Sequence, residues 1–195
     1  MIYLLALALL LPDLAGAQRQ ETLANSAKVK GGFGSLYFTF SQADGRSGGG
    51  AGLGGAFVID DFFIGGYFQG ENFGTRRYSN RNYIQALSSG GFWLGYAIPS
   101  HKMLHVYTAL KLGWGAAALR RDDNDPYDGD DITDGVLVLA PEIGAELNVL
   151  RWLRIALTGG FRLVGGLDTL PGYQTRDFNS PTLGLTFRMG GFGYR

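Results

Sequence analysis

Apolar residues alternate with small or polar residues along eight separate stretches of this chain. Near residue 140, for example, Leu139, Ile143 and Leu147 occupy odd positions while Glu142 and Glu146 occupy even ones. Successive side chains of an extended chain point to opposite faces, so a period of two predicts a β-strand. After the first seventeen residues, no long stretch keeps the 3.6-residue period of an amphipathic helix. The sequence therefore predicts an all-β protein with eight strands of roughly nine to eleven residues.

The connections between these predicted strands are alternately short and long. The short ones are Asp60-Asp61, 99–102 and 148–150. The longer, polar ones are 42–48, 70–83, 118–134 and 165–180. Short turns at one end and longer loops at the other are typical of an up-and-down antiparallel barrel in an outer membrane. An even number of strands also brings both ends of the barrel to the side of the short turns.

The composition favours lipid over water as the solvent of the apolar face. Charged residues make up 17% of the chain, against about 25% in ordinary soluble domains. The opposite face is rich in Gly, Ser, Thr and Tyr, which suit the narrow interior of an eight-stranded barrel. In hydrocarbon, a closed barrel is the one non-helical structure that pairs all of its backbone groups. We therefore expect a transmembrane antiparallel up-and-down β-barrel with short periplasmic turns and longer outer loops.

Aromatic residues near the ends of the predicted strands agree with this expectation, because membrane barrels carry aromatic girdles there. They are Phe40, Phe68, Tyr96, Trp114, Trp152, Phe192 and Tyr194. A soluble barrel also alternates, however, so a secreted ligand-binding barrel is kept as an alternative.

The first residues of the chain have the features of a targeting signal. Residues 2–11 are continuously apolar, and Ala15-Gly16-Ala17 forms a small-x-small cleavage site. Such a run is typical of a secretory signal peptide and falls short of the about 20 residues of a membrane-spanning helix. We expect a signal peptide at 1–17, a short periplasmic lead-in at 18–33 and the barrel at 34–195.

Several segments carry a resemblance to a known family. They are Gly31-Gly32-Phe33-Gly34 leading into Phe38-Thr39-Phe40-Ser41-Gln42 and the Asp44-Gly45 turn, residues 141–149 running into Leu153-Arg154-Ile155, and the closing strand 183–187. In these segments the chain resembles the small eight-stranded outer-membrane β-barrel proteins of the Bacteroidetes type and, more broadly, the OmpA/OmpX-like barrels. The resemblance implies an outer-membrane barrel and says little about activity, because members of this group mostly lack an assigned one.

Six charged residues fall on the face that we expect to line the barrel interior. They are Lys111, Glu142, Glu146, Arg154, Arg162 and Arg188. Buried charges must be paired, and these four bases and two acids come from neighbouring strands. We expect them to pair across strands and fill the lumen as an ionic plug. A narrow, weakly anion-favouring pore is the alternative.

The composition excludes several classes of function. The chain has 17 basic and 17 acidic residues, so it lacks the basic excess of a nucleic-acid binder. It has no cysteine and two histidines, which argues against disulfides, thiolate metal sites and multi-histidine metal centres. The G-x-G-x-x-G spelling at residues 50–55 precedes a predicted strand, whereas a dinucleotide-binding turn precedes a helix. We therefore expect no cofactor and no metal site.

The longest predicted loop contains an acidic run at 122–134. Six of its aspartates fall within the ten residues 122–131, and Asp134 follows. Oxygen-rich loops bind Ca²⁺, but the EF-hand order, with glycine at the sixth position, is met in no register. We expect a charged outer loop, with divalent-cation binding or bridging to lipopolysaccharide phosphates as the alternatives.

Together these patterns predict a monomeric, non-enzymatic outer-membrane protein with a structural or surface-interaction role. Its expected partners are outer-membrane lipid, lipopolysaccharide and an envelope protein of unknown identity. A minor pore or accessory channel is the second hypothesis. A lipid A-modifying enzyme comes last, because Ser100, His101 and His105 fall at the predicted periplasmic end, the wrong side for that chemistry.

Overall fold

The computed structural model describes residues 29–78, 81–98, 102–121, 132–168, 170 and 172–193. The elements are β1 (Val29–Ala43), β2 (Arg46–Ile59), β3 (Phe62–Tyr78), β4 (Arg81–Ile98), β5 (Leu104–Arg121), β6 (Ile132–Leu150), β7 (Leu153–Gly165), the short 3-10 helix η1 (Thr175–Phe178) and β8 (Ser180–Gly191). The predicted signal peptide, residues 18–28 of the lead-in, Ser100, His101 and the acidic run 122–131 lie outside the described residues.

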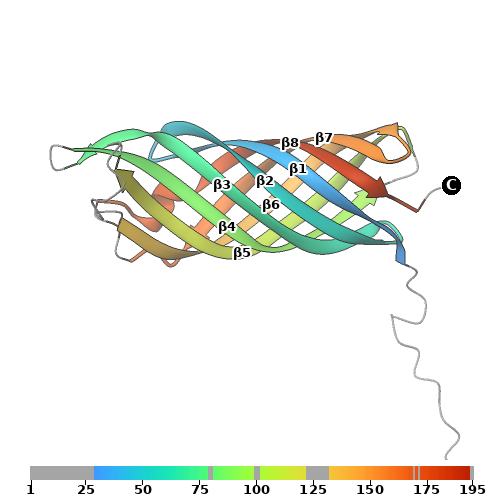
Figure 1. Cartoon of the computed structure of the whole chain (residues 1–195), viewed down its shortest axis with the longest axis horizontal. Coiled ribbons are helices and arrows are strands. Elements are labelled where there is room, and N and C mark those ends of the chain that lie inside the picture. Colours follow the sequence, from blue (N-terminus) through green and yellow to red (C-terminus); the bar gives the residue numbers. More distant parts are fainter. Residues whose placement is uncertain are drawn as a thin grey trace, which may run out of the picture.

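The eight strands form one closed antiparallel barrel, as predicted. Each strand pairs with the next along the chain, and β8 pairs with β1 to complete the cylinder. At the closing seam, Leu36 of β1 lies opposite both Leu53 of β2 and Phe187 of β8. Figure 1 shows the strands inclined to the barrel axis, with β8 beside β1. We call the end that holds the β2–β3 and β6–β7 turns the lower end, and the opposite end the upper end.

The strands are longer than the sequence pattern predicted. They range from 12 residues in β8 to 19 in β6. The predicted loops at 42–48 and 70–83 are corrected: Asp44-Gly45 alone separates β1 from β2, and β3 runs to Tyr78. Asp44 and Gly45 have φ angles of 50° and 71°, which suits a tight hairpin turn that follows the twist of the strands. The strands extend beyond the segments of alternating apolar residues, because their end segments consist of small and polar residues that carry no apolar pattern.

Two further boundaries differ from prediction, and one is confirmed. β1 begins at Val29, so residues 29–33 of the predicted lead-in belong to the barrel wall. β6 continues to Leu150, which moves the next turn from 148–150 to Arg151-Trp152. The predicted turn at Asp60-Asp61 is confirmed.

The outer face of the barrel is covered with exposed apolar side chains on all eight strands. Those exposed by more than half of their area include Phe40, Leu53, Phe57, Phe68, Phe92, Ile98, Leu104, Trp114, Leu137, Ile143, Leu157 and Leu183. We call the exposed apolar residues of the barrel wall the apolar belt. Phe192, by contrast, was predicted in an aromatic girdle but is buried, because it turns into the lower end and stacks on Phe33.

Glycines on the inner face leave space for large side chains from neighbouring strands. A Cβ at Gly52 would overlap the ring of Tyr37, and one at Gly95 would overlap the ring of Phe63. A Cβ at Gly54 would lie 3.1 Å from the ring of Trp93, which is fully buried in the lumen. The high glycine content therefore lets aromatic side chains fill a narrow interior.

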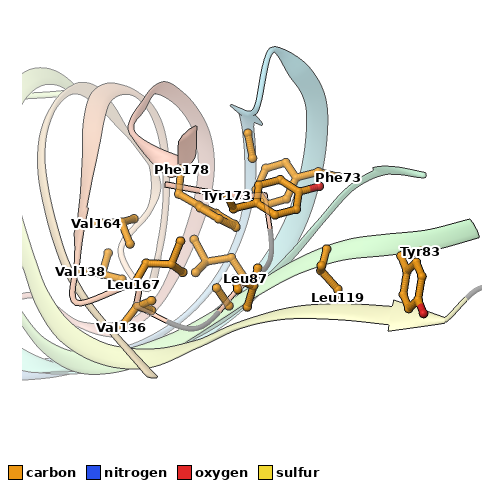
Figure 2. Packing of buried hydrophobic residues seen from close by; sticks show 13 residues of the cluster. Phe73, Tyr83, Leu87, Leu119, Val136, Val138, Val164, Leu167, Tyr173 and Phe178 are labelled. Carbon is orange, nitrogen blue, oxygen red and sulfur yellow. The ribbon is translucent and has the colours of Figure 1, made fainter. Parts of the chain in front are cut away.

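The β7–β8 connection packs against the inner side of the barrel wall at the upper end. Leu167, Leu170, Tyr173 and Phe178 from this connection are buried, Phe178 completely. They pack with side chains of the barrel wall in one apolar cluster, which Figure 2 shows from close by. We call residues 166–179 the cap. The predicted loop at 165–180 is thus a folded structure whose apolar side belongs to the barrel core.

Gln85 is a buried polar residue beside the same cluster. Its side chain is 0% exposed, and neither of its amide atoms has a hydrogen-bond partner among the described residues. Its cross-strand neighbours are Phe73 and Leu119. A buried amide without a partner costs about 1–3 kcal/mol, so we expect Gln85→Met to raise the free energy of unfolding by about 1 kcal/mol, measured by urea titration in micelles. Gln42→Met on the exposed outer face should change it little, and a destabilised Gln85→Met variant contradicts the argument.

Candidate functional site: the charged lumen and its cap

Glu146 of β6 is the centre of a charged cluster at the lower end. Its Oε1 accepts a hydrogen bond from Arg154 Nη1 at 3.0 Å, and its Oε2 accepts one from Arg188 Nη1 at 2.6 Å. His105 Nε2 lies 3.0 Å from Oε1. Arg154 and Arg188 face each other across β7 and β8, so their like charges would repel without the shared carboxylate. All four side chains are nearly or completely buried.

Aromatic rings surround the guanidinium of Arg188. Its Cζ lies 4.3 Å from the ring centre of Tyr107 and 4.8 Å from that of Phe63. The rings of Trp93 and Phe33 are 5.0 Å and 5.1 Å away. Cation–π contacts of this kind stabilise a desolvated cation. One carboxylate and four rings therefore hold this arginine inside the barrel.

A second ion pair lies higher in the lumen. Lys111 Nζ of β5 donates to Glu142 Oε1 of β6 at 2.8 Å. The same ammonium lies 4.1 Å from the ring centre of Tyr37 and 5.6 Å from that of Trp93. The pair joins the wall formed by β5 and β6 to aromatic side chains of β1 and β4.

A third ion pair lies directly below the cap. Arg162 Nη1 donates to Glu71 Oε2 at 2.7 Å, and both side chains are 1% exposed. Ser41 Oγ donates to the same carboxylate oxygen, and Gln69 Nε2 donates to Glu71 Oε1 at 3.0 Å. Glu71 therefore has partners for both oxygens, as a buried carboxylate requires.

Arg162 also holds the cap in place. Its Nε donates to the backbone oxygen of Phe178 at 3.0 Å, and its Nη2 donates to the backbone oxygen of Gln42 at 2.9 Å. Three further hydrogen bonds join cap and barrel: Asp44 N to Asp177 O at 2.7 Å, Val164 N to Asn179 Oδ1 at 2.7 Å, and Asp168 N to Asp134 Oδ2 at 2.6 Å. A single guanidinium thus connects the lumen carboxylate of Glu71 to the cap.

The structure allows a direct prediction for this connection. Arg162→Lys keeps a positive charge beside Glu71 but removes the fork that reaches Phe178 and Gln42. We expect amide hydrogens within residues 172–179 to exchange about fivefold faster, because the hydrogen bond from Arg162 to the cap oxygen of Phe178, of about 1 kcal/mol, is lost. Arg176→Lys on the exposed side of the cap is the control, measured by hydrogen exchange with mass spectrometry. Unchanged exchange in Arg162→Lys would show that the guanidinium does not hold the cap.

All six charged residues predicted for the lumen point into it, but they form three groups instead of one network. Glu71 and His105 were missed as members of these groups. Glu71 fell in a predicted loop, although Gln69 and Glu71 continue the inner-face alternation of β3. His105 lay on the predicted inner face, but was considered only as a catalytic candidate.

One small cavity lies beside the charged cluster at the lower end. The cavity at the lower end, between Phe33, Glu146, Arg154 and Arg188, measures ≈ 20 Å³, about the space of one water molecule. Within the described ranges, no group of three acidic or histidine side chains is placed to hold a metal ion. In the same part of the chain, no helix is long and apolar enough to cross a membrane.

Two solved structures resemble this barrel over nearly their whole length. Neisserial surface protein A has a TM-score of 0.62 and 14% sequence identity, over 82% of this chain and 95% of that chain. Ail, the attachment invasion locus protein of Yersinia pestis, crystallised with the heparin analogue sucrose octasulfate, has a TM-score of 0.50 and 16% identity, over 82% and 96%. The fold is that of the small eight-stranded outer-membrane β-barrels. At these identities the likeness concerns the fold alone.

Sequence comparison adds little to this result. No protein-family model matches the chain. The probable peptidoglycan glycosyltransferase FtsW of Methylococcus capsulatus is 32% identical over 92 residues, which cover 42% of this chain and 23% of that protein. The chain thus spans less than a quarter of the length of this curated relative.

Proposed function

We propose that the protein is a non-enzymatic β-barrel of the bacterial outer membrane that acts as a structural or surface-interaction protein. The observation that carries this proposal is the apolar belt, which surrounds a closed barrel on all eight strands. Each large apolar side chain left in water forgoes about 1.5–3 kcal/mol of burial. Lipid offers such a surface an apolar environment, and a secreted soluble barrel does not. The expected signal peptide at 1–17 would direct the chain to this location.

The proposal includes a plugged lumen. Three ion-pair groups and their aromatic neighbours occupy the lower and middle interior, and the cap cluster occupies the upper interior. Such an interior supports a rigid body that presents its outer surface, with the barrel as an anchor. The names of the two similar proteins, a surface protein and an attachment protein, support the same role. We also propose that the protein belongs to the Bacteroidetes-type group of these small barrels and that it is a monomer.

The location is tested by fractionation and by gel migration. We expect the protein in the outer-membrane fraction, and we expect unheated and boiled samples to migrate differently in detergent gels, because a closed barrel resists the detergent until heated. A soluble periplasmic protein that migrates identically in both states contradicts the proposal.

The second hypothesis, a minor pore, is tested by conductance. A plugged barrel should be silent in a planar bilayer. Channels that change when Lys111 is replaced by Gln would favour the pore instead, because Lys111 lies in the middle of the lumen.

A further inference from the structure

The outer surface of β3, β4 and β5 is hollowed above the apolar belt. The groove measures ≈ 220 Å³ and is lined mostly by small or polar residues, with two inward-facing side chains between them: Gly70, Glu71, Asn72, Ala86, Leu87, Ser88, Ala116, Ala118 and Arg120. On the same three strands, nearer the lower end, stand the exposed rings of Phe68, Phe92 and Trp114. The groove is therefore continuous with the surface that we propose to face lipid.

Arg120 supplies a positive charge at the upper side of the groove. Its side chain is exposed, and it has no hydrogen-bond or ion-pair partner among the described residues. Arg76, Arg77, Arg81 and Arg121 also belong to the upper ends of these three strands.

No acidic side chain on these strands offsets this positive charge at the groove. Within the described parts of β3, β4 and β5, the one acidic residue is Glu71. Its carboxylate is bound by Arg162 inside the barrel. Among the described lining residues, Arg120 is thus the one charge that faces outward, and this favours an anionic ligand.

We propose that this groove binds the headgroup of a phosphorylated glycolipid of the outer leaflet. The phosphate binds the Arg120 guanidinium, whose planar fork matches phosphate oxygens. The sugar lies against the small residues, receives a hydrogen bond from the Asn72 amide and donates one to the Ser88 hydroxyl, whose own proton goes to Ala116 O. The acyl chains continue over the apolar belt beside Phe92 and Trp114. This inference rests on the proposed membrane location and adds a ligand to it.

The charge and the position of the groove favour this occupant over two others. A second copy of the chain, related by a two-fold axis through the groove, would bring the two Arg120 side chains together, and like charges disfavour such an interface. A free polysaccharide would leave unexplained why the groove opens directly onto the apolar belt. An amphipathic anion fits both surfaces at once.

The test measures binding of bisphosphorylated lipid A to the folded full-length protein in detergent micelles by native mass spectrometry, with EDTA present. We expect Arg120→Gln to raise the Kd about tenfold, which corresponds to the loss of one charged hydrogen bond. Ala118→Leu, which fills the groove without changing charge, should also raise it several-fold. Arg176→Gln makes the same charge change on the cap and should leave the Kd within about twofold.

Three outcomes would overturn the inference. The first is lipid A binding to Arg120→Gln and Ala118→Leu as tight as binding to the wild type. The second is equal weakening by Arg176→Gln, which would indicate non-specific attraction. Loss of wild-type binding in EDTA would assign it to divalent cations and the acidic segment 122–131. Heat-modifiable migration is recorded for every variant: a wild type that lacks it contradicts the proposed function, whereas a folded barrel indifferent to Arg120 contradicts the glycolipid site alone.

Discussion

Replacing Glu146 by glutamine is expected to lower the free energy of unfolding by about 3–5 kcal/mol, because removing one member of a buried ionic group leaves the others uncompensated. Arg154 and Arg188 both depend on this carboxylate, and the side chain of Glu146 is completely buried. An amide retains one acceptor oxygen but no charge, so two neighbouring guanidinium groups would repel each other in a desolvated interior. Urea-induced unfolding of the barrel in micelles, followed by tryptophan fluorescence, measures the loss.

Glu142→Gln is the matched control for Glu146→Gln. Glu142 has one ionic partner and a side chain that is 12% exposed, so its loss should cost clearly less. The double variant Glu146→Gln/Arg188→Met should recover part of the stability, because it also removes one of the two unpaired cations. Equal destabilisation by Glu146→Gln and Glu142→Gln would show that the shared carboxylate has no special role.

Gly52→Val is expected to destabilise the barrel by about 3 kcal/mol or more, at the upper end of the effects of overpacking. Its Cβ would overlap the ring of Tyr37 and lie 2.6 Å from the backbone oxygen of Phe68. Tyr37 is 1% exposed, so its ring cannot move away without displacing other lumen side chains. When samples are heated stepwise before electrophoresis, we expect the variant to lose the gel migration of the folded barrel at a lower temperature than the wild type. A variant that cannot fold would lack this migration even without heating.

Ala51→Val adds the same kind of side chain one position away, on the exposed outer face. Valine favours strands and meets no lumen residue there, so we expect a change within about 0.5 kcal/mol. If Gly52→Val folds as well as Ala51→Val, steric exclusion by the inner-face glycines does not shape this barrel.

The sequence allowed the assignment of faces because the period of two is a local property of each strand. Glu146 and Leu147 are neighbours in sequence, yet one is buried in the lumen and the other is exposed in the belt. Closure also followed from the pattern, since strands in hydrocarbon cannot leave an unpaired edge. These inferences needed no knowledge of which residues meet across the barrel.

The cap and the partner of Arg162 could not be predicted in the same way. Arg162 and Glu71 are 91 positions apart, and only the order and tilt of the strands bring them together. Phe178 lies in a segment with no period, so its burial depends on how the connection folds over the upper end. Residues joined by tertiary geometry alone leave no repeating signal in the sequence.

The connection between cap and barrel wall has an energetic consequence for any ligand of the outer surface. Phe178 shares one apolar cluster with wall residues such as Leu87 and Val138, so the cap is expected to unfold together with the barrel. A molecule that binds the folded cap therefore stabilises the whole protein by mass action, by about 2.7 kcal/mol at a concentration one hundred times its Kd. Thermal-shift screening of the intact barrel would consequently detect ligands of a segment only fourteen residues long. An antibody selected against the cap would likewise report on the fold of the entire cylinder.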